Sequence, residues 1–437
     1  MTDPLDILRA PLALPCGASL PNRLAKAAMT EGLATADGEP DARLATLYAR
    51  WARGGAGLLL TGNVLVDRDH LERPGNVVLD RPPTARAREG FRAWARAAED
   101  NGAHIWMQIS HAGRQTSKAV NPTPKSASAV TLALPGDRFG TPVPLTGGEI
   151  LDLIDRFANA AAVARETGFH GVQIHAAHGY LISQFLSPRV NQRQDEWGGD
   201  LAGRARFLLA VVDKTRARVG ADFPVSVKLN SADFQRDGFS FEDSHTVAGW
   251  LDAAGVDLIE ISGGTYEQPK MMNLEGMEPS FDPTTSAATR ARESYFARFA
   301  PEMREHVKRA ALMVTGGFRT AAGMAAAVRD DGVDLIGVAR PLCVDPDQVR
   351  KLLSGEISEL DRWEDRLRLG PGLLGPASPI KLIKAINGFG AQSWYYEQIV
   401  RLGEGRDAEP KLGFAKAMGD AGKREKAVLA AFRARGG

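Results

Sequence analysis

The strongest constraint on the fold is a regular alternation of short apolar stretches with longer amphipathic ones. Short runs rich in β-branched residues predict buried strands, and longer stretches with helical periodicity predict helices. Eight expected strands alternate with helices, which favours the α/β class and a (β/α)8 (TIM) barrel. The expected strands are residues 24–29, 57–61, 104–109, 171–175, 225–230, 258–262, 312–315 and 335–338. The expected helices are residues 42–53, 85–101, 149–167, 203–219, 241–254, 295–309 and 321–330.

The runner-up fold is a doubly wound open sheet, which is built from the same alternation. Such a sheet usually carries a glycine-rich dinucleotide-binding loop directly after its first strand. Here the first expected strand ends in Ala27-Ala28-Met29-Thr30, which contains no glycine. The closed barrel is therefore the preferred prediction.

Three segments fall outside the barrel pattern. Residues 7–20 are expected to form an N-terminal hairpin that covers the bottom of the barrel. Residues 116–146, rich in Pro, Ser, Thr and Gly, are expected to form a long loop over its mouth. We divide the chain into a barrel domain, residues 1–370, and a C-terminal helical extension, residues 371–437.

The C-terminal extension combines helical and aromatic signals. It has an amphipathic stretch at residues 380–386, an aromatic cluster at Trp394, Tyr395 and Tyr396, and a charged helical stretch at residues 411–435. We expect the extension to pack on its own barrel or on a second subunit, so a homo-oligomer stays open. The alternative is that the aromatic cluster reaches the substrate mouth or a membrane surface.

Composition and charge argue against several classes of partner. Lys plus Arg number 54 and Asp plus Glu 53, a net charge of +1, so nothing points to nucleic acid. The only cysteines, Cys16 and Cys343, are too few for an iron–sulfur cluster and indicate reduced cytosolic thiols. The uncharged run 167–188 holds three histidines and two glutamines, so we do not interpret it as a membrane span. We expect a cytoplasmic protein with no membrane partner.

Polar side chains gather where the middle strands of the expected barrel end. Gln108 lies on the third strand, His175, His178 and Tyr180 lie at the end of the fourth, and Lys228 lies on the fifth. The carboxyl ends of barrel strands form the catalytic face, so we expect these groups to share one site. Two imidazoles can hold an oxygen by hydrogen bonds, and a phenol can deliver a proton.

The last two expected strands end in a different set of residues. Gly316-Gly317 follows the seventh strand, and Ala339-Arg340 follows the eighth. Loops at these positions of a barrel commonly bind phosphate. Glycines allow the backbone to approach closely, and a guanidinium can grip phosphate through two N–H groups. We therefore expect a phosphate on this side of the mouth, and a polar aromatic ring with a substrate oxygen on the other.

The order of these motifs resembles the Old Yellow Enzyme family of FMN-dependent ene-reductases (NADH:flavin oxidoreductases). The resemblance spans residues 5–360 and depends on the combination of motifs, since each alone is weak. The motifs are Asn22-Arg23-Leu24, Met29-Thr30, Gln108 with His111-Ala112-Gly113-Arg114, residues 175–181, residues 184–188, residues 191–199, Arg204 with Arg206-Phe207, Gly316-Gly317 and Arg340-Pro341.

The resemblance implies a role for each candidate residue around a bound FMN. Met29 and Thr30 would border the flavin ring, with the Thr30 hydroxyl near its C4 oxygen, and Gly62 would lie against the ring. Gln108 would bond the pyrimidine edge of the ring, and Lys228 would lie near N1 and the C2 oxygen. The residues that would hold the phosphate are Gly316, Gly317, Ala339 and Arg340.

The same resemblance implies a reaction. NADPH or NADH would reduce the flavin, which would then pass hydride to the β-carbon of an activated alkene, a small-molecule substrate. His175 and His178 would grip the carbonyl oxygen of that substrate, and Tyr180 would donate a proton to its α-carbon. Imidazole N–H groups stabilise the charge that builds on the oxygen, and a phenol with a pKa of about 10 is protonated at neutral pH. The predicted activity is NAD(P)H-dependent reduction of α,β-unsaturated carbonyl compounds.

Other functions stay open from the sequence. The flavin could instead serve a dehydrogenase of amines or of saturated carbonyl compounds, which would have no use for Tyr180 as a proton donor. The chain could also bind a flavin or another ligand without turnover. His175 and His178 have a spacing that suits metal ligation, but no third ligand is evident, so we predict no metal site.

Four positions depart from the pattern of the family, one of which is Ala28, where many members have proline. Lys228 stands where arginine is usual, which keeps the charge and loses the planar fork. Ala339 stands where many members have glycine, and Gly32 stands where some place a tyrosine over the substrate. The roof of the site must then come from elsewhere, such as Tyr266 or the loop around Phe139. The natural substrate, the choice between NADH and NADPH, and the oligomeric state stay open.

Overall fold

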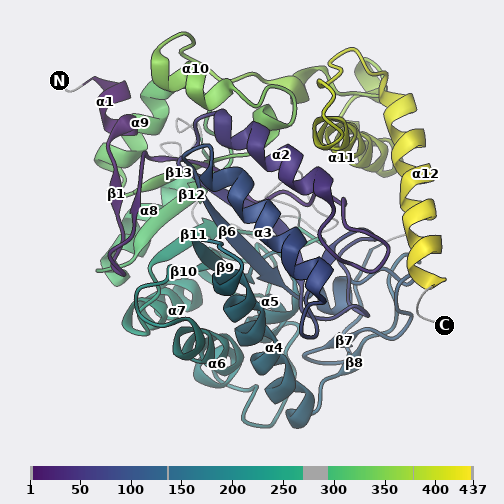
Figure 1. Ribbon diagram of the computed structural model, residues 1–437. Coiled ribbons are helices and arrows are strands. Elements are labelled where there is room, and N and C mark those ends of the chain that lie inside the picture. The colour runs from purple at the N-terminus through teal and green to yellow at the C-terminus, as the bar shows by residue number, and fades with distance from the viewer. Residues whose placement is uncertain (1–2, 135–136, 269–293, 377, 435–437) are drawn as a thin grey trace.

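A closed ring of parallel strands forms the centre of the molecule (Figure 1). The computed structural model describes residues 3–134, 137–268, 294–376 and 378–434. The first ring strand pairs with both the second and the last, so the sheet has no open edge there, which confirms the (β/α)8 barrel over the doubly wound sheet. The ring strands are β3 (Leu24–Lys26), β4 (Leu58–Leu65), β6 (His104–Ser110), β9 (Gly171–Ala176), β10 (Val225–Asn230), β11 (Leu258–Ser262), β12 (Ala311–Thr315) and β13 (Leu335–Val338).

The strands match the expected positions to within one residue, except for the first two strands of the barrel. β3 ends at Lys26, three residues before the expected end at Met29, because the chain leaves the sheet to form the loop that carries Met29 and Thr30. β4 continues to Leu65, and its pairing with β6 shifts register between Leu60 and Asn63. A short strand, β5 (Val77–Val78), pairs with the end of β4.

Helices cover the outside of the barrel, and their ends follow local sequence signals. Thr146 and Glu149 form a capping box at the start of α4 (Gly147–Glu166), and the Asp200 side chain caps α6 (Leu201–Val219). The expected helix 295–309 is divided into η4 (Phe296–Phe299) and α8 (Ala300–His306), with a proline in the first turn of α8. The other outer helices are α2 (Ala42–Arg53), α3 (Ala85–Glu99), α4 (Gly147–Glu166), α6 (Leu201–Val219), α7 (Phe241–Ala253) and α9 (Ala321–Asp330).

The bottom of the barrel is closed by the expected hairpin, which is shorter than predicted. Residues 4–9 form helix α1 (Pro4–Arg9), so the hairpin consists of β1 (Leu12–Ala13) and β2 (Ser19–Leu20). Buried Leu12, Leu14 and Leu20 pack against apolar side chains from inside the barrel. The lower end of the ring is thus filled, which leaves the opposite end for ligands.

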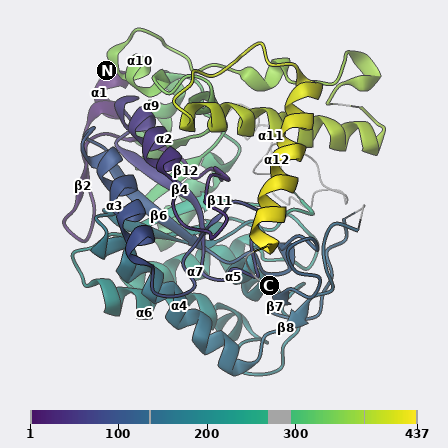
Figure 2. The ribbon, with the colours of Figure 1, turned by 45° about the vertical axis from the view of Figure 1, so that its right-hand side comes forward.

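The C-terminal extension forms two long helices that lie together beside the barrel (Figure 2). They are α11 (Lys381–Gly403), which includes the aromatic cluster, and α12 (Phe414–Arg433). An ion pair of 2.7 Å joins Arg50 of α2 to Asp407, so the extension contacts its own barrel as expected. The division into two domains at residue 370 stays a prediction.

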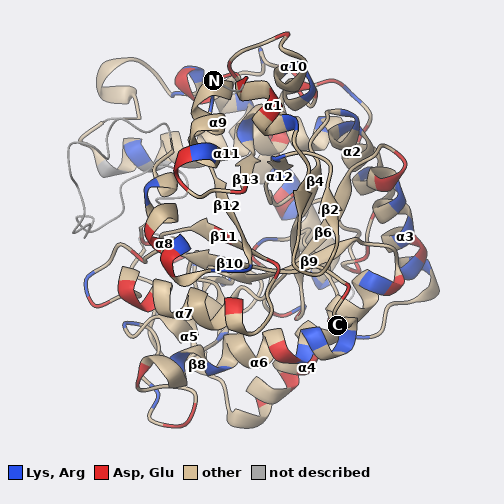
Figure 3. Ribbon diagram, turned by 90° about the vertical axis from the view of Figure 1, so that its left-hand side faces the viewer, with Lys and Arg blue, Asp and Glu red and all other residues tan. Residues whose placement is uncertain are grey.

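The outer surface carries charges of both signs interspersed over the helices (Figure 3). No helix in the described part of the chain combines the length and the apolar character needed to span a membrane.

Candidate active site

The two imidazoles and the phenol predicted at the end of the fourth barrel strand meet in the structure. β9 carries His175, which the strand register places beside Lys228 of β10. The ring centroid of His175 lies 5.0 Å from that of His178 and 4.8 Å from that of Tyr180, and both contacts are edge-to-face. His175 is 3% exposed and Tyr180 is 6% exposed. The barrel mouth therefore holds a compact, buried group of proton donors.

The ring nitrogens of this pair are only partly used by the protein. His175 Nδ1 accepts a hydrogen bond of 3.3 Å from the Ala177 N–H, so His175 carries its proton on Nε2. His178 Nε2 lies 2.6 Å from Ser262 Oγ. Neither His175 Nε2 nor His178 Nδ1 has a hydrogen-bond partner among the described residues. Each ring keeps one nitrogen for a ligand.

Both imidazoles are held neutral by their surroundings. Burial lowers the pKa of His175 well below its usual range, and His178 and Lys228 lower it further. Burial and the charge of Lys228 also lower the pKa of His178. A neutral imidazole still donates one N–H, so the pair can hold a carbonyl oxygen without adding net charge to the site.

His178 is held in an unusual backbone conformation. Its φ of 63° lies in the left-handed region, which is strained for a residue with a side chain. Asn230 Oδ1 accepts a hydrogen bond from the His178 N–H, and Gln115 Nε2 donates to the His178 carbonyl, both at 3.0 Å. At Gly179, φ is 77° and a Cβ would lie 2.6 Å from Gln115 Oε1, so only glycine fits. Strain that the surroundings enforce is typical of functional sites.

Tyr180 lies in a set of polar groups that keep it protonated. Its hydroxyl lies 3.0 Å from the hydroxyl of Tyr266. Burial raises the pKa of Tyr180 well above its usual range, and the nearby Glu72 carboxylate and Tyr266 raise it further. The Thr30 hydroxyl donates to Glu72 Oε2 at 2.7 Å, so it must turn from Glu72 to donate to a ligand. Sequence reasoning missed Glu72, which lies in a loop with no motif.

A buried series of polar side chains links four neighbouring strands, β6, β9, β10 and β11. Gln108 Nε2 donates to Gln173 Oε1 at 2.7 Å, and Gln173 Nε2 donates to Glu260 Oε2 at 2.9 Å. Lys228 Nζ lies 2.9 Å from Glu260 Oε1. In this series of hydrogen bonds, Gln108 Oε1 has no partner among the described residues. The positive charge of Lys228 is balanced by the carboxylate of Glu260, which was not among the residues predicted from the sequence.

Met29 and Gly62 are brought together by Glu31, another residue that sequence reasoning missed. Glu31 Oε1 accepts a hydrogen bond of 2.9 Å from the Gly62 N–H and a second from the Tyr48 hydroxyl. A Cβ at Gly62 would lie 2.2 Å from Glu31 Oε2 and 2.6 Å from the Met29 carbonyl oxygen. Glycine at this position therefore lets the loop after β3 lie against β4. Met29 Sδ also lies 3.4 Å from Cys343 Sγ, next to the phosphate end of the site.

The expected phosphate end contains two successive left-handed glycines and two arginines. Gly316 and Gly317 have φ values of 92° and 86°, and no atom lies within 4 Å of a Cβ at Gly316. Ala339 precedes the short helix η5 (Arg340–Cys343). Arg340 lies 3.6 Å from the Glu364 carboxylate, which also pairs with Arg319. Sequence reasoning predicted Arg340 and missed Arg319, although Arg319 directly follows the glycine pair and Phe318.

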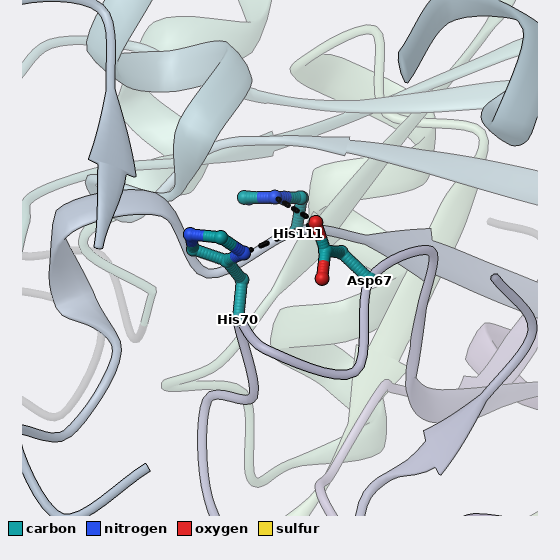
Figure 4. A group of neighbouring side chains, drawn as sticks. All are labelled: Asp67, His70 and His111. Carbon is teal, nitrogen blue, oxygen red and sulfur yellow. Dashed lines mark ion pairs between the residues drawn. The ribbon is translucent and has the colours of Figure 1, made fainter. Parts of the chain in front are cut away.

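A second pair of histidines lies near the mouth, together with an aspartate (Figure 4). The rings of His70 and His111 are stacked with centroids 4.5 Å apart. His70 Nδ1 lies 3.1 Å and His111 Nε2 lies 3.7 Å from Asp67 Oδ2. Although burial opposes it, the two imidazoles hold the pKa of Asp67 well below its usual range, so Asp67 is ionised. This group has the residue types of a metal site.

The hydrogen bonds on the far side of both rings favour a structural role for this group. His70 Nε2 accepts a hydrogen bond from the Lys125 N–H at 2.8 Å, and His111 Nδ1 accepts one from the Gly113 N–H at 3.0 Å. The nitrogens that face Asp67 must then carry the protons, whereas a metal ligand needs a free lone pair there. We therefore interpret the group as an electrostatic connection between the loops that follow β4 and β6.

Comparison with known proteins places the barrel in a wide group of flavoproteins. A model of the "NADH:flavin oxidoreductase / NADH oxidase family" matches residues 8–359. The NADH-dependent flavin oxidoreductase iliE of Hypocrea jecorina is 37% identical over 358 residues, which cover 77% of this chain and 86% of the relative. A Neonectria protein with the same name is 38% identical over 355 residues, and there the match spans 77% of this chain but only 45% of the relative.

Solved structures of the same group share the fold. An Old Yellow Enzyme homologue of Zymomonas mobilis is 25% identical, with a TM-score of 0.67 over 83% of this chain and 97% of that one. Morphinone reductase in complex with tetrahydroNAD is 24% identical, with a TM-score of 0.64 over 80% of this chain and 91% of that one. The family match ends at residue 359, before the C-terminal extension begins.

Proposed function

Because this chain belongs to the NADH:flavin oxidoreductase / NADH oxidase family, whose cofactor is FMN and whose reductant is a nicotinamide, we propose that it reduces activated C=C bonds. The proposed substrates are α,β-unsaturated carbonyl compounds. The observation that carries this proposal is the group of His175, His178 and Tyr180, in which two neutral imidazoles with available nitrogens lie beside a protonated phenol.

The residues present fit FMN at both of its ends. Gln108 Oε1 is available to accept a hydrogen bond from the ring, and Lys228 uses one described contact, with Glu260, which leaves N–H groups for the ring. Met29, Thr30 and Gly62 would border the ring. At the other end, the phosphate would be held by Gly316, Gly317, Ala339 and Arg340.

The chemistry that bound FMN would supply is hydride transfer, from the reduced nicotinamide to the β-carbon of the substrate. The protein supplies position and protons. His175 Nε2–H and one nitrogen of His178 would hold the carbonyl oxygen and stabilise the charge that builds on it. Tyr180 would deliver the proton to the α-carbon, and burial ensures that its proton is present at neutral pH.

The proton donor also favours reduction over the reverse reaction. A dehydrogenase of amines or of saturated carbonyl compounds must remove a proton, and a phenol whose pKa is raised by burial is a poor base for that step. No observation on this chain favours a binding protein without turnover.

Absorbance of the purified protein tests the proposal. We expect a flavin spectrum that NADH or NADPH bleaches in the absence of oxygen, and that returns when 2-cyclohexenone is added. A control with cyclohexanone, which lacks the alkene, should leave the flavin reduced. A protein that takes up no FMN, or whose reduced flavin is not reoxidised by the enone, would contradict the proposal.

A further inference from the structure

Helix α11 lies against the barrel through buried aromatic and aliphatic side chains. Trp394 is 1% exposed, and its Nε1 donates to the Leu412 carbonyl at 3.0 Å. Ile399, Val400 and Leu402 of the same helix belong to the main hydrophobic core. Figures 1 and 2 both show α11 packed with α12, which runs toward β7 (Lys125–Ser126) and β8 (Val143–Pro144) at the mouth. The extension is therefore built into the fold and ends beside the loops of the mouth.

Two consecutive tyrosines of α11 point to the two ends of the proposed site. The Tyr395 hydroxyl donates to Glu364 Oε2 at 3.3 Å. Glu364 is the carboxylate that pairs with Arg319 and Arg340 at the expected phosphate end. Tyr395 thus has a hydrogen bond to the carboxylate that pairs with both arginines of the expected phosphate end.

Tyr396 lies at the other end, beside the group that surrounds Tyr180. The Arg73 guanidinium lies over the Tyr396 ring, 3.8 Å from its centroid. Glu72, next to Arg73 in the chain, accepts the hydrogen bond from Thr30. Burial raises the pKa of Tyr180, and among the groups that raise it further are Glu72, Tyr266 and Tyr396. Tyr396 is therefore connected to the surroundings of the proposed proton donor through Arg73, whose chain neighbour Glu72 binds the Thr30 hydroxyl.

The position of Arg73 explains how the structure covers the site without a large side chain at residue 32. A Cβ at Gly32 would point to the guanidinium of Arg73, 3.7 Å away from Cζ. Arg73 and Tyr396 thus fill the space next to Gly32, and a small cavity beside them is lined by residues of the barrel and of α12. The Arg73 Nη1 atom is buried and has no hydrogen-bond partner in the described part of the chain.

We propose that helix α11 forms part of the wall of the active site, and that Tyr396, stacked on Arg73, limits the size of the substrate that can bind beside Tyr180. The proposal rests on the function proposed above. It makes Tyr396, which lies outside the family match, and Arg73, which lies inside it, specificity-determining residues. Tyr395 has a different part, since its contact with Glu364 would position the arginines of the phosphate end.

Competition between a small and a bulky substrate tests the role of Tyr396. The kcat/KM values for 2-cyclohexenone and for the larger enone carvone should be measured for the wild type, Tyr396→Ala and Tyr396→Trp. We expect Tyr396→Ala to shift the ratio about tenfold toward carvone, which is the discrimination that one buried methylene can supply, and Tyr396→Trp to shift it the other way. An unchanged ratio in both variants would overturn the proposal.

Two control variants distinguish a direct effect of Tyr396 on substrate size from an indirect effect of weakened packing between the extension and the barrel. Leu382→Ala changes an exposed residue of α11, and Arg50→Ala removes the ion pair with Asp407. Both should keep the wild-type ratio of kcat/KM. If Arg50→Ala shifts the ratio as much as Tyr396→Ala does, the effect comes from loss of packing, and the proposal is wrong. Tyr396→Phe, which keeps the ring over which Arg73 lies, should retain the wild-type ratio and provides a variant that folds if Tyr396→Ala does not.

A binding measurement distinguishes failure of this proposal from failure of the proposed function. The dissociation constants of cyclohexanone and of the bulkier ketone menthone can be obtained from changes in flavin absorbance without turnover. If the wild type reduces neither enone, the proposed function is wrong. A higher affinity for menthone relative to cyclohexanone in Tyr396→Ala than in the wild type would still support Tyr396 as a residue that limits ligand size. The same relative affinities in wild type and Tyr396→Ala would contradict it.

Discussion

Two pairs of histidines lie near the mouth of this barrel, and they differ in what their ring nitrogens do. In the pair His175 and His178, each ring keeps one nitrogen without a described partner. In the pair His70 and His111, one nitrogen of each ring accepts a backbone hydrogen bond and the other faces Asp67. All four residues lie in the barrel mouth, so location alone does not separate them. On the basis of these nitrogens we propose ligand binding for the first pair and a structural role for the second.

The largest expected effect concerns the phenol that accompanies the first pair. Tyr180→Phe should slow reoxidation of the reduced flavin by 2-cyclohexenone by about 10²–10⁴-fold, because the general acid is lost. Reduction of the flavin by NADH should change little, since that step needs no proton from Tyr180. Stopped-flow absorbance measures both steps.

The matched control for this variant is Tyr266→Phe, which removes the partner hydroxyl at 3.0 Å and leaves Tyr180 in place. We expect a smaller loss than in Tyr180→Phe. Equal slowing of both half-reactions in Tyr180→Phe would argue against the acid role.

The second pair should matter for stability instead of turnover. Asp67→Ala removes the carboxylate that two buried imidazole nitrogens face, so the free energy of unfolding should fall by about 2–4 kcal/mol. Urea unfolding measures the loss, and kcat for the folded fraction should stay close to that of the wild type.

Asp69→Ala is the neighbouring control, because Asp69 is exposed and its side chain lies outside the group. Its free energy of unfolding should stay within about 0.5 kcal/mol of the wild type. A selective loss of turnover in Asp67→Ala, with stability intact, would reverse the assignment of the two pairs.

Both pairs predict that the fold weakens in mild acid. Burial lowers the pKa of His111 from 6.5 to about 4, with His70 adding to the effect, and burial likewise lowers the pKa values of His175 and His178. Between pH 6.5 and about pH 4, the unfolded chain therefore binds protons that the folded chain excludes. The contribution of the neutral imidazoles to the free energy of unfolding is complete above pH 6.5 and is lost as the pH falls. Urea midpoints at pH 7.5, 5.5 and 4.5 should decrease in that order. A midpoint that is flat or rises on acidification would show that these imidazoles are not held neutral.

The smallest expected effect is that of added metal. If the protons of His70 and His111 face Asp67, then Zn²⁺ finds no free lone pair there. The melting temperature in excess Zn²⁺ should equal that in EDTA. A rise that Asp67→Ala abolishes would mean that the group binds metal and that the tautomers are the opposite of those inferred.

The barrel could be predicted from the sequence because the same pattern, an apolar strand followed by an amphipathic helix, recurs along the chain. Each strand is a short apolar run that is buried on both faces, and β10 and β11 have the predicted bounds. The end of β3 was predicted three residues too late, because Ala27 to Met29 are as apolar as a strand but leave the sheet. Helix α1 was missed because its six residues are too few to show a period.

The candidate site was predictable where its residues lie on barrel strands or directly after them. His175 and Lys228 are neighbours in register, so their meeting follows from the topology alone. Glu260 was missed because a single carboxylate inside an apolar strand carries no motif. Arg73 and Tyr396 were not predicted as partners, since their contact depends on how the extension folds back onto a loop, which no local pattern encodes.

The most direct test of the central claim compares one residue from each pair in a single turnover. The rate at which 2-cyclohexenone reoxidises the reduced flavin should be measured by stopped flow for the wild type, His175→Ala and His111→Ala. Loss of one donor to the developing oxyanion predicts a decrease of about 10²–10³-fold in His175→Ala. The folded fraction of His111→Ala should react at nearly the wild-type rate. Equal rates in His175→Ala and the wild type would contradict the account.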